Sequence, residues 1–251
     1  MDSNIESYYY NIASKGSKDF KHLAMKKLAE IASSATQILD MGCGEGTRLG
    51  LLKSKAEKYG IDINKFAITN ARKKYKNIKF EIGNLENLPY KDNFFDLVYS
   101  AYVFEHLDNP KKVIAEGLRV LKKNGHLIII APNFGAPNRA SPPSKENRLT
   151  KLIHGFVFDF LLTRELNWQK VTPISTIDKY DIDWDTTIEP YIKSLMEFLK
   201  RKHMKIDYYS SCWQEETSEN GIFQKVFRVL GEIGFYPFNL WGPHLIVVAQ
   251  K

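Results

Sequence analysis

Residues 38–46 read ILDMGCGEG, and they join a short apolar stretch, Gln37 to Met41, to a predicted helix that extends to about Lys55. The apolar stretch predicts a buried β-strand. Glycines in a strand-to-helix turn allow positive φ angles and a close approach of the backbone to a ligand. In an open α/β sheet, ligands bind at this carboxyl end of the strands. The nine residues therefore predict a ligand site at the first turn of an α/β fold.

Strand and helix patterns alternate on both sides of this turn. The other predicted strands are 59–63, 78–82, 94–101 and 125–131, and the predicted helices are 17–34, 65–76 and 110–121. The fifth strand contains the continuous apolar run LIIIA, which is typical of a parallel strand buried on both faces. The alternation predicts a parallel sheet with helices on both faces.

Beyond the fifth strand the pattern changes, because residues 132–147 hold four prolines and predict a loop. Two helix-then-strand units, 190–211 and 222–241, then compete for the sixth strand. We favour 222–241, because a short hairpin would connect it to a final strand over 244–250. The unit 190–211 would then belong to a cap inserted over residues 132–211.

Composition excludes several classes of protein. The chain has 251 residues, of which 43% are hydrophobic and 26% charged, which is ordinary for a globular domain. We find no apolar run near the ~20 residues of a membrane-spanning helix and no secretory signal. Two cysteines, Cys43 and Cys212, form neither a disulfide framework nor a zinc set. A cytoplasmic protein without a transmembrane segment or a bound metal is the expectation.

The net charge is +7 and comes from lysine, with 28 Lys against 8 Arg spread along the chain. Arginine binds phosphates and base edges better than lysine does, because its planar guanidinium can donate two parallel hydrogen bonds. We interpret the excess mainly as a solubility feature and expect no nucleic-acid partner. An anionic membrane surface or nucleic acid remains the minority alternative.

Two acids flank the glycine turn. Asp40 precedes the glycines, and Asp62 ends the second strand, where a carboxylate can accept hydrogen bonds from two ribose hydroxyls. No lysine follows the glycines as a phosphate-binding loop requires. The spacing is Gly-x-Gly-x-Gly rather than the Gly-x-Gly-x-x-Gly of nicotinamide-binding folds.

At this point the sequence resembles the class I S-adenosyl-L-methionine-dependent methyltransferases, most closely the small-molecule, type 11-like branch. The resemblance covers residues 37–131 well and the ends more loosely. It implies a Rossmann-like, doubly wound α/β fold: a seven-stranded sheet with an antiparallel last strand, plus the inserted helical cap. The single domain over 1–251 would comprise an N-terminal helical segment (1–35), a cofactor-binding core (36–131), the cap, and a C-terminal helix and hairpin (212–251).

The resemblance also implies the cofactor S-adenosyl-L-methionine, the product S-adenosyl-L-homocysteine and a set of contact residues. Asp40 and the glycine turn fall on the motif that holds the methionine part, Asp62 on the ribose acid, and Ile63 beside the adenine. Asn84 stands where the family commonly has an acid, and an amide can still donate to and accept from adenine. The full set of expected cofactor contacts is Tyr9, Asp40, Gly42, Cys43, Gly44, Gly46, Asp62, Ile63, Asn84, Leu85, Ser100 and Ala101.

The residues after the fourth predicted strand are candidates for the acceptor pocket, namely Tyr102, Glu105 and His106. An alcohol or phenol acceptor must lose a proton, and His106 is the candidate catalytic base. A structural role for this histidine is equally open. An acidic run that includes Asp183 and Asp185 lacks the glycine and spacing of a calcium-binding loop, so we expect it to contact a polar acceptor such as a sugar.

A stripe of apolar residues follows the proline-rich loop at helical spacing over 149–161. Packing or a homodimer contact, a lid over an apolar acceptor, and a membrane-surface helix are the three interpretations. A membrane-surface helix is usually richer in Lys and Arg than this one.

Three functions remain in competition. We favour methyl transfer to a small-molecule or glycan acceptor, at oxygen. An RNA or protein methyltransferase is the alternative, although Ser100-Ala101-Tyr102 stands where amino-directed enzymes of nucleic acids have an Asn-Pro-Pro-Tyr type motif. A cofactor-binding protein without turnover is the third, and the intact acids and glycines disfavour it.

Overall fold

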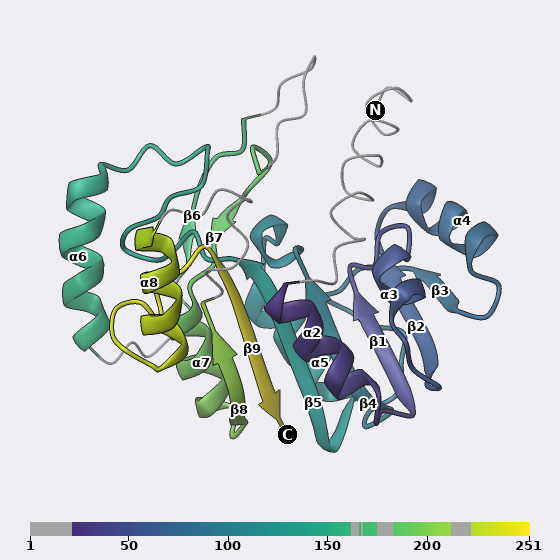
Figure 1. The fold of residues 1–251 in the computed structure, drawn as a ribbon. Coiled ribbons are helices and arrows are strands. Elements are labelled where there is room, and N and C mark those ends of the chain that lie inside the picture. Colours follow the sequence, from purple (N-terminus) through teal and green to yellow (C-terminus); the bar gives the residue numbers. More distant parts are fainter. Residues whose placement is uncertain (1–21, 162–165, 167, 175–182, 212–221) are drawn as a thin grey trace.

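The computed structural model describes residues 22–161, 166, 168–174, 183–211 and 222–251. A seven-stranded sheet has the order β3-β2-β1-β4-β5-β9-β8, and β9 runs antiparallel to both of its neighbours. The strands are β1 (Gln37–Met41), β2 (Glu57–Asp62), β3 (Lys79–Ile82), β4 (Phe95–Ala101), β5 (Leu121–Pro132), β8 (Lys205–Ser210) and β9 (His244–Gln250). The predicted fold class is confirmed, and the carboxyl ends of the parallel strands point upward in Figure 1.

Helices cover both faces of the sheet because neighbouring strand residues point to opposite sides. Ile38 belongs to an apolar cluster that includes residues of α2 (Leu23–Ala32), α3 (Thr47–Leu51) and α4 (Lys65–Lys74). Leu39 belongs to a second cluster, which includes residues of α5 (Pro110–Val120) and α7 (Ile192–Arg201). Figure 1 shows α2 in front of the sheet and α5 behind it. The remaining elements are η1 (Phe104–His106), α6 (Arg148–Phe160), α8 (Ile222–Glu232) and the small antiparallel pair β6 (Gln169–Lys170) and β7 (Ile188–Glu189).

The prediction that the unit 222–241 supplies the sixth strand is wrong. The strand beside β9 is β8, which belongs to the unit 190–211, and Lys205 pairs with Gln250. Residues 233–241 form turns instead, because Pro237 has no N–H for a ladder and its carbonyl accepts from the N–H groups of Leu240 and Trp241. The cap therefore does not extend to residue 211, and the expected C-terminal hairpin does not form.

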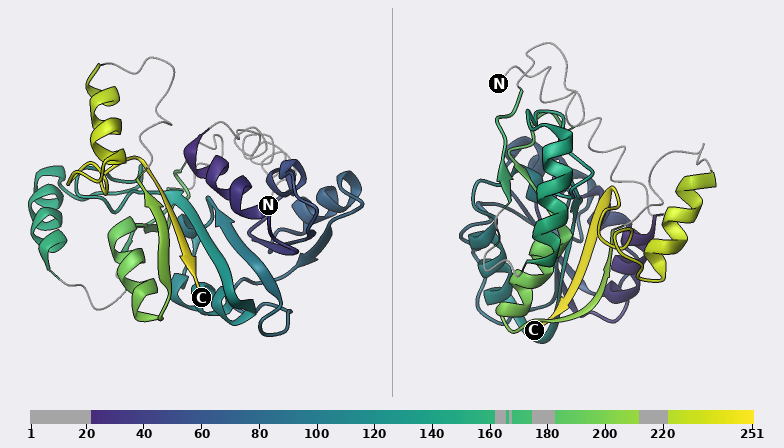
Figure 2. Two further views of the ribbon diagram at one scale, coloured as in Figure 1. Left: turned by 60° about the horizontal axis from the view of Figure 1, so that its bottom comes forward. Right: turned by 90° about the vertical axis from the view of Figure 1, so that its left-hand side faces the viewer.

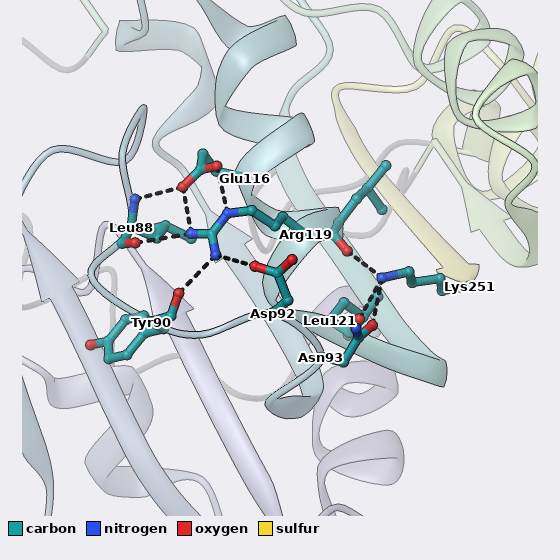
Figure 3. A network of polar contacts seen from close by, with 9 residues as sticks. Leu88, Tyr90, Asp92, Asn93, Glu116, Arg119, Leu121 and Lys251 are labelled. Carbon is teal, nitrogen blue, oxygen red and sulfur yellow. Dashed lines mark hydrogen bonds and ion pairs between the residues drawn. The ribbon is translucent and has the colours of Figure 1, made fainter.

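A network around Arg119 fixes the segment between β3 and β4 (Figure 3). The guanidinium donates to the carboxylates of Glu116 and Asp92 and to the carbonyls of Leu88 and Tyr90 at 2.7–2.9 Å. Arginine can hold this many acceptors because it carries five N–H donors in a planar fork. The segment 88–92 is thereby tied to the last turn of α5, just before the amino end of β4.

Candidate active site

The glycine turn leaves β1 with three positive φ angles, of 82° at Gly42, 51° at Gly44 and 75° at Gly46. A Cβ atom on Gly42 would lie 2.4 Å from the Val103 side chain, and one on Gly46 would lie 2.5 Å from the Phe80 ring. A Cβ atom on Gly44 would meet no atom of the described residues within 4 Å. Two glycines are thus required by packing, whereas Gly44 borders open space in which a ligand can approach the backbone.

Asp62 lies at the end of β2 and faces the same turn. Its Oδ2 atom accepts from the Gly44 N–H at 2.8 Å, and its Oδ1 atom accepts from the Asn64 N–H at 2.8 Å. Burial raises the pKa of Asp62, although these backbone donors act in the opposite direction. Each carboxylate oxygen has a second lone pair, so Asp62 can still accept from two hydroxyls. Ile63 beside it is 74% exposed, an apolar surface suited to a flat ring.

Asp40 is fully buried at the end of β1. The Tyr99 hydroxyl donates to its Oδ2 atom at 2.7 Å, and its Oδ1 atom has no hydrogen-bond partner among the residues that the structure describes. Burial raises the pKa of Asp40 to about 7, although the cationic Arg48 works against this shift. An unsatisfied buried carboxylate oxygen is costly unless a ligand donor reaches it.

Arg48 is a site residue that the sequence analysis missed. It lies in α3, and it is only 9% exposed. Its guanidinium donates to the Ala101 carbonyl at 3.3 Å and lies 5.5 Å from the ring centroid of Tyr102. Arginine in a short helix usually points to solvent, so only its position directly after the glycine turn could have drawn attention to it.

The other expected cofactor contacts divide into two groups. Asn84 is exposed just after the end of β3, and its Oδ1 atom accepts from the Glu86 N–H at 2.8 Å, so the amide nitrogen is the group that can donate to a ligand. Ser100 is buried and donates to the Met41 carbonyl at 2.8 Å, so its side chain links β4 to β1.

Three expected contacts offer little side-chain chemistry. Leu85 and Ala101 are buried in the two apolar clusters. Cys43 is also buried, and burial raises the pKa of its thiol far above the usual value. These three residues can contact a ligand mainly through their backbones. Tyr9 lies outside the described residues.

Glu105 and His106 lie in η1, directly after β4. Glu105 is 1% exposed, and burial raises its pKa to about 7, although His106 acts in the opposite direction. Its Oε1 atom is 3.8 Å from His106 Nε2, and its Oε2 atom has no partner within the described part of the chain. Tyr102, at the start of this segment, has a φ of 60°, and its ring meets that of His244 edge-on at 5.7 Å.

The acidic loop reaches His106 from about 80 residues away. The Nδ1 atom of His106 lies 3.3 Å from the Asp185 carbonyl oxygen and 3.6 Å from its carboxylate. Thr187 anchors this contact, because its N–H donates to the Glu105 carbonyl at 2.9 Å. Burial lowers the pKa of His106, but Glu105, Asp185 and Asp183 together outweigh it, and the net pKa is raised.

The cluster does not have the form of a metal site. Within the described ranges, no group of three His, Cys, Asp or Glu side chains could hold a metal ion. Asp178 and Asp181, which begin the acidic run, lie outside those ranges. No described helix is long and apolar enough to cross a bilayer.

Comparisons with known proteins agree with this geometry. A family model described as a methyltransferase domain matches residues 32–178. Norajmaline N-methyltransferase of Rauvolfia serpentina is 26% identical over 174 residues, which cover 64% of this chain and 59% of that protein. Demethylmenaquinone methyltransferase of Thermotoga maritima is 32% identical over 129 residues, which cover 50% and 51% of the two chains. The chain thus spans little more than half the length of these relatives.

A solved structure shows the same fold. The S-adenosylmethionine-dependent methyltransferase from Mesorhizobium loti superimposes with a TM-score of 0.56 over 90% of this chain and 97% of the other, at 14% identity. The family match covers more than half of the chain, and it includes the glycine turn, both acids and η1. The chain therefore belongs to the family of methyltransferase domains that use S-adenosyl-L-methionine.

Proposed function

We propose that this S-adenosyl-L-methionine-dependent methyltransferase methylates a small-molecule or glycan acceptor at an oxygen atom, with His106 as the base. The observation that carries the proposal is the partly exposed imidazole of His106, held between Glu105 and Asp185 at the end of β4. When bound, the cofactor supplies a methyl group that is already activated on a sulfonium. The chain's own residues must then hold the cofactor, place the acceptor and remove its proton.

The residues at the glycine turn fit the parts of this cofactor. The Asp40 Oδ1 atom, which has no partner among the described residues, suits an ammonium group, and the nearby Arg48 suits a carboxylate. Asp62 offers free lone pairs to two ribose hydroxyls. Ile63 and the amide nitrogen of Asn84 offer an apolar surface and a donor to the adenine. We therefore assign cofactor binding to these side chains and to the backbone of Gly44.

The acceptor's proton would go to His106. If Nδ1–H donates to the Asp185 carbonyl, Nε2 carries the lone pair that can accept a proton from a hydroxyl. The nearby carboxylates stabilise the imidazolium that results, and this is the physical cause of the raised pKa of His106. We propose that the described loop 183–187, which contacts Glu105 and His106, places the acceptor beside this histidine.

The named relatives support a small acceptor but not a particular atom. One relative is named for N-methylation of norajmaline, another for methylation of demethylmenaquinone, and a third is a C-methyltransferase of ubiquinone and menaquinone biosynthesis. The choice of oxygen thus depends on the histidine alone, because an uncharged amine acceptor already has its lone pair and needs no base to attack.

The variant His106→Gln tests the base. We expect roughly a 100-fold or larger loss of kcat, with the affinity for S-adenosyl-L-homocysteine unchanged. In the unmodified enzyme, activity falls as the pH drops through the raised pKa of His106, because the protonated ring cannot accept a proton. In the variant, this fall in activity at low pH should be absent. Full activity in His106→Gln would refute oxygen methylation by this base.

The acceptor class requires a separate measurement. Methyl-labelled cofactor and the purified protein are added to a lysate of the source organism, and the lipid, small-molecule, polysaccharide, RNA and protein fractions are separated. We expect label in the lipid, small-molecule or polysaccharide fraction. Label in RNA or protein would contradict the proposal and support the alternative function.

A further inference from the structure

Helix α6 buries two charged residues and exposes most of its apolar residues. Lys151 and Asp159 are its two buried residues. The apolar side chains at helical spacing face solvent, including Leu149, Ile153, Phe156, Val157, Phe160 and the adjoining Leu161, which are 49–67% exposed. A helix that only packs onto its own domain buries its apolar stripe, and α6 does the opposite. Within the described residues, packing against the body of this chain therefore covers only part of the stripe.

The inverted orientation is held by two sets of polar contacts. Lys151 donates to the Phe134 carbonyl at 2.9 Å and pairs with the buried Glu189. Asp159 accepts from the Tyr191 hydroxyl at 2.5 Å and from the Trp241 indole at 2.8 Å. Turning the apolar stripe inward would break these contacts and leave two charges buried without partners.

The apolar surface continues from α6 onto the segment after α8. The Tyr236 ring lies 5.4 Å from Phe160 and 6.1 Å from Phe156. Phe235, which directly precedes Tyr236, is exposed, as are Val229 and Ile233 of the α8 region. Figures 1 and 2 show α6 and α8 at the same end of the molecule, away from the glycine turn. We call the exposed apolar residues of α6 and α8, together with Phe235 and Leu161, the outer apolar face.

Among the described residues, cations outnumber acids around this face. The exposed ionisable groups on α6 and the turn before it are Lys145, Arg148 and His154, and Lys225 is exposed on α8. The acid of α6, Asp159, is buried, and Glu232 of α8 forms an ion pair with Arg228. The whole chain carries a net charge of +7. In a dimer formed through this face, the cations of the two copies would repel each other. An anionic surface would attract the same cations.

We propose that the outer apolar face docks on an anionic lipid surface. Apolar and aromatic side chains bordered by cations are the chemistry that inserts between lipid headgroups, and cations near anionic lipids add attraction. The polar side of α6, which an isolated interfacial helix would turn to water, here holds the helix to the protein. The proposal depends on α6 and α8 alone and not on the identity of the acceptor.

Vesicle flotation with the purified full chain tests the proposal. We expect binding to phosphatidylcholine vesicles that contain about 30% phosphatidylglycerol, and weaker binding to phosphatidylcholine alone or at high salt. The variant Ile153→Glu should weaken binding about tenfold or more. The matched control is Leu51→Glu, which introduces the same charge at a residue 47% exposed on α3, compared with 55% for Ile153.

A second pair of variants tests the electrostatic part. Arg148→Glu should weaken binding to the anionic vesicles roughly fivefold or more, and Lys53→Glu, an exposed residue elsewhere, should change it far less. Circular dichroism and S-adenosyl-L-homocysteine affinity confirm that each variant is folded.

Three results would overturn the proposal. The first is no binding to anionic vesicles, and the second is equal binding by Ile153→Glu and the unmodified protein. The third is a dimer in light scattering that Ile153→Glu converts to a monomer, since the face would then join two copies.

Discussion

The buried carboxylate under α6 and those at the carboxyl ends of β1 and β4 differ in how completely they are hydrogen-bonded. Under α6, Glu189 accepts from the Ser141 N–H and hydroxyl with one oxygen and from Lys151 with the other. At the sheet edge, Asp40 and Glu105 are as deeply buried, yet each has one carboxylate oxygen without a partner among the described residues.

This difference separates structural from functional charges. A buried charge with every lone pair satisfied holds its neighbours in place, and removing its partner is costly. A buried carboxylate that is only half satisfied has a raised pKa and can accept from a ligand, which is typical of functional sites. The comparison predicts that variants under α6 change stability, whereas variants at the sheet edge change cofactor binding.

Among these variants, Glu189→Ala should have the largest effect, and the effect should be on stability. It leaves the Lys151 ammonium buried without its carboxylate, and the expected cost is about 3–5 kcal/mol in the free energy of unfolding. Urea denaturation measures it. The matched control is Glu30→Ala, which breaks the exposed pair with Lys27 and should cost under about 1 kcal/mol. Equal losses in the two variants would remove the distinction between the regions.

Asp62→Ala should have the next largest effect, on binding rather than on stability. Loss of charge-assisted contacts to two hydroxyls should weaken S-adenosyl-L-homocysteine binding by about 2–3 kcal/mol, measured by calorimetry. Because Asp62 also holds the Gly44 N–H, Asp62→Asn serves as the conservative comparison. Unchanged affinity in Asp62→Ala would refute the ribose assignment.

Asp40 should make cofactor binding depend on pH. Its pKa is about 7 in the free protein, and a cationic ammonium group would lower it in the complex. Binding must then release a proton below pH 7, so affinity should rise with pH, by up to about tenfold per unit, and level off above about pH 7. Calorimetry across this range measures the slope, and Asp40→Asn should flatten it. A slope that persists in the variant would assign the proton to another group.

Much of the fold could be predicted because its signals are local. The strand Gln37–Met41 was predicted with its observed bounds from its apolar run, and α8 begins at Ile222, where the predicted unit 222–241 begins. The site residues Asp40 and Asp62 were identifiable because a residue at the end of a parallel strand must lie at the ligand-binding edge. The short pair β6 and β7 escaped prediction, since two residues carry no periodic pattern.

The sequence by itself determined the methyltransferase fold, the glycine turn and the acids beside it, because strand ends and turns follow from neighbouring residues. Only the tertiary structure decided which strand joins β9, that Asp185 reaches His106, and that Arg48 is buried near Asp40. It also decided that α6 turns its apolar side outward, because that orientation depends on partners such as Glu189 and Trp241, far away in the chain. Contacts between distant residues leave no periodic signal, so a pattern can reveal a stripe but not what faces it.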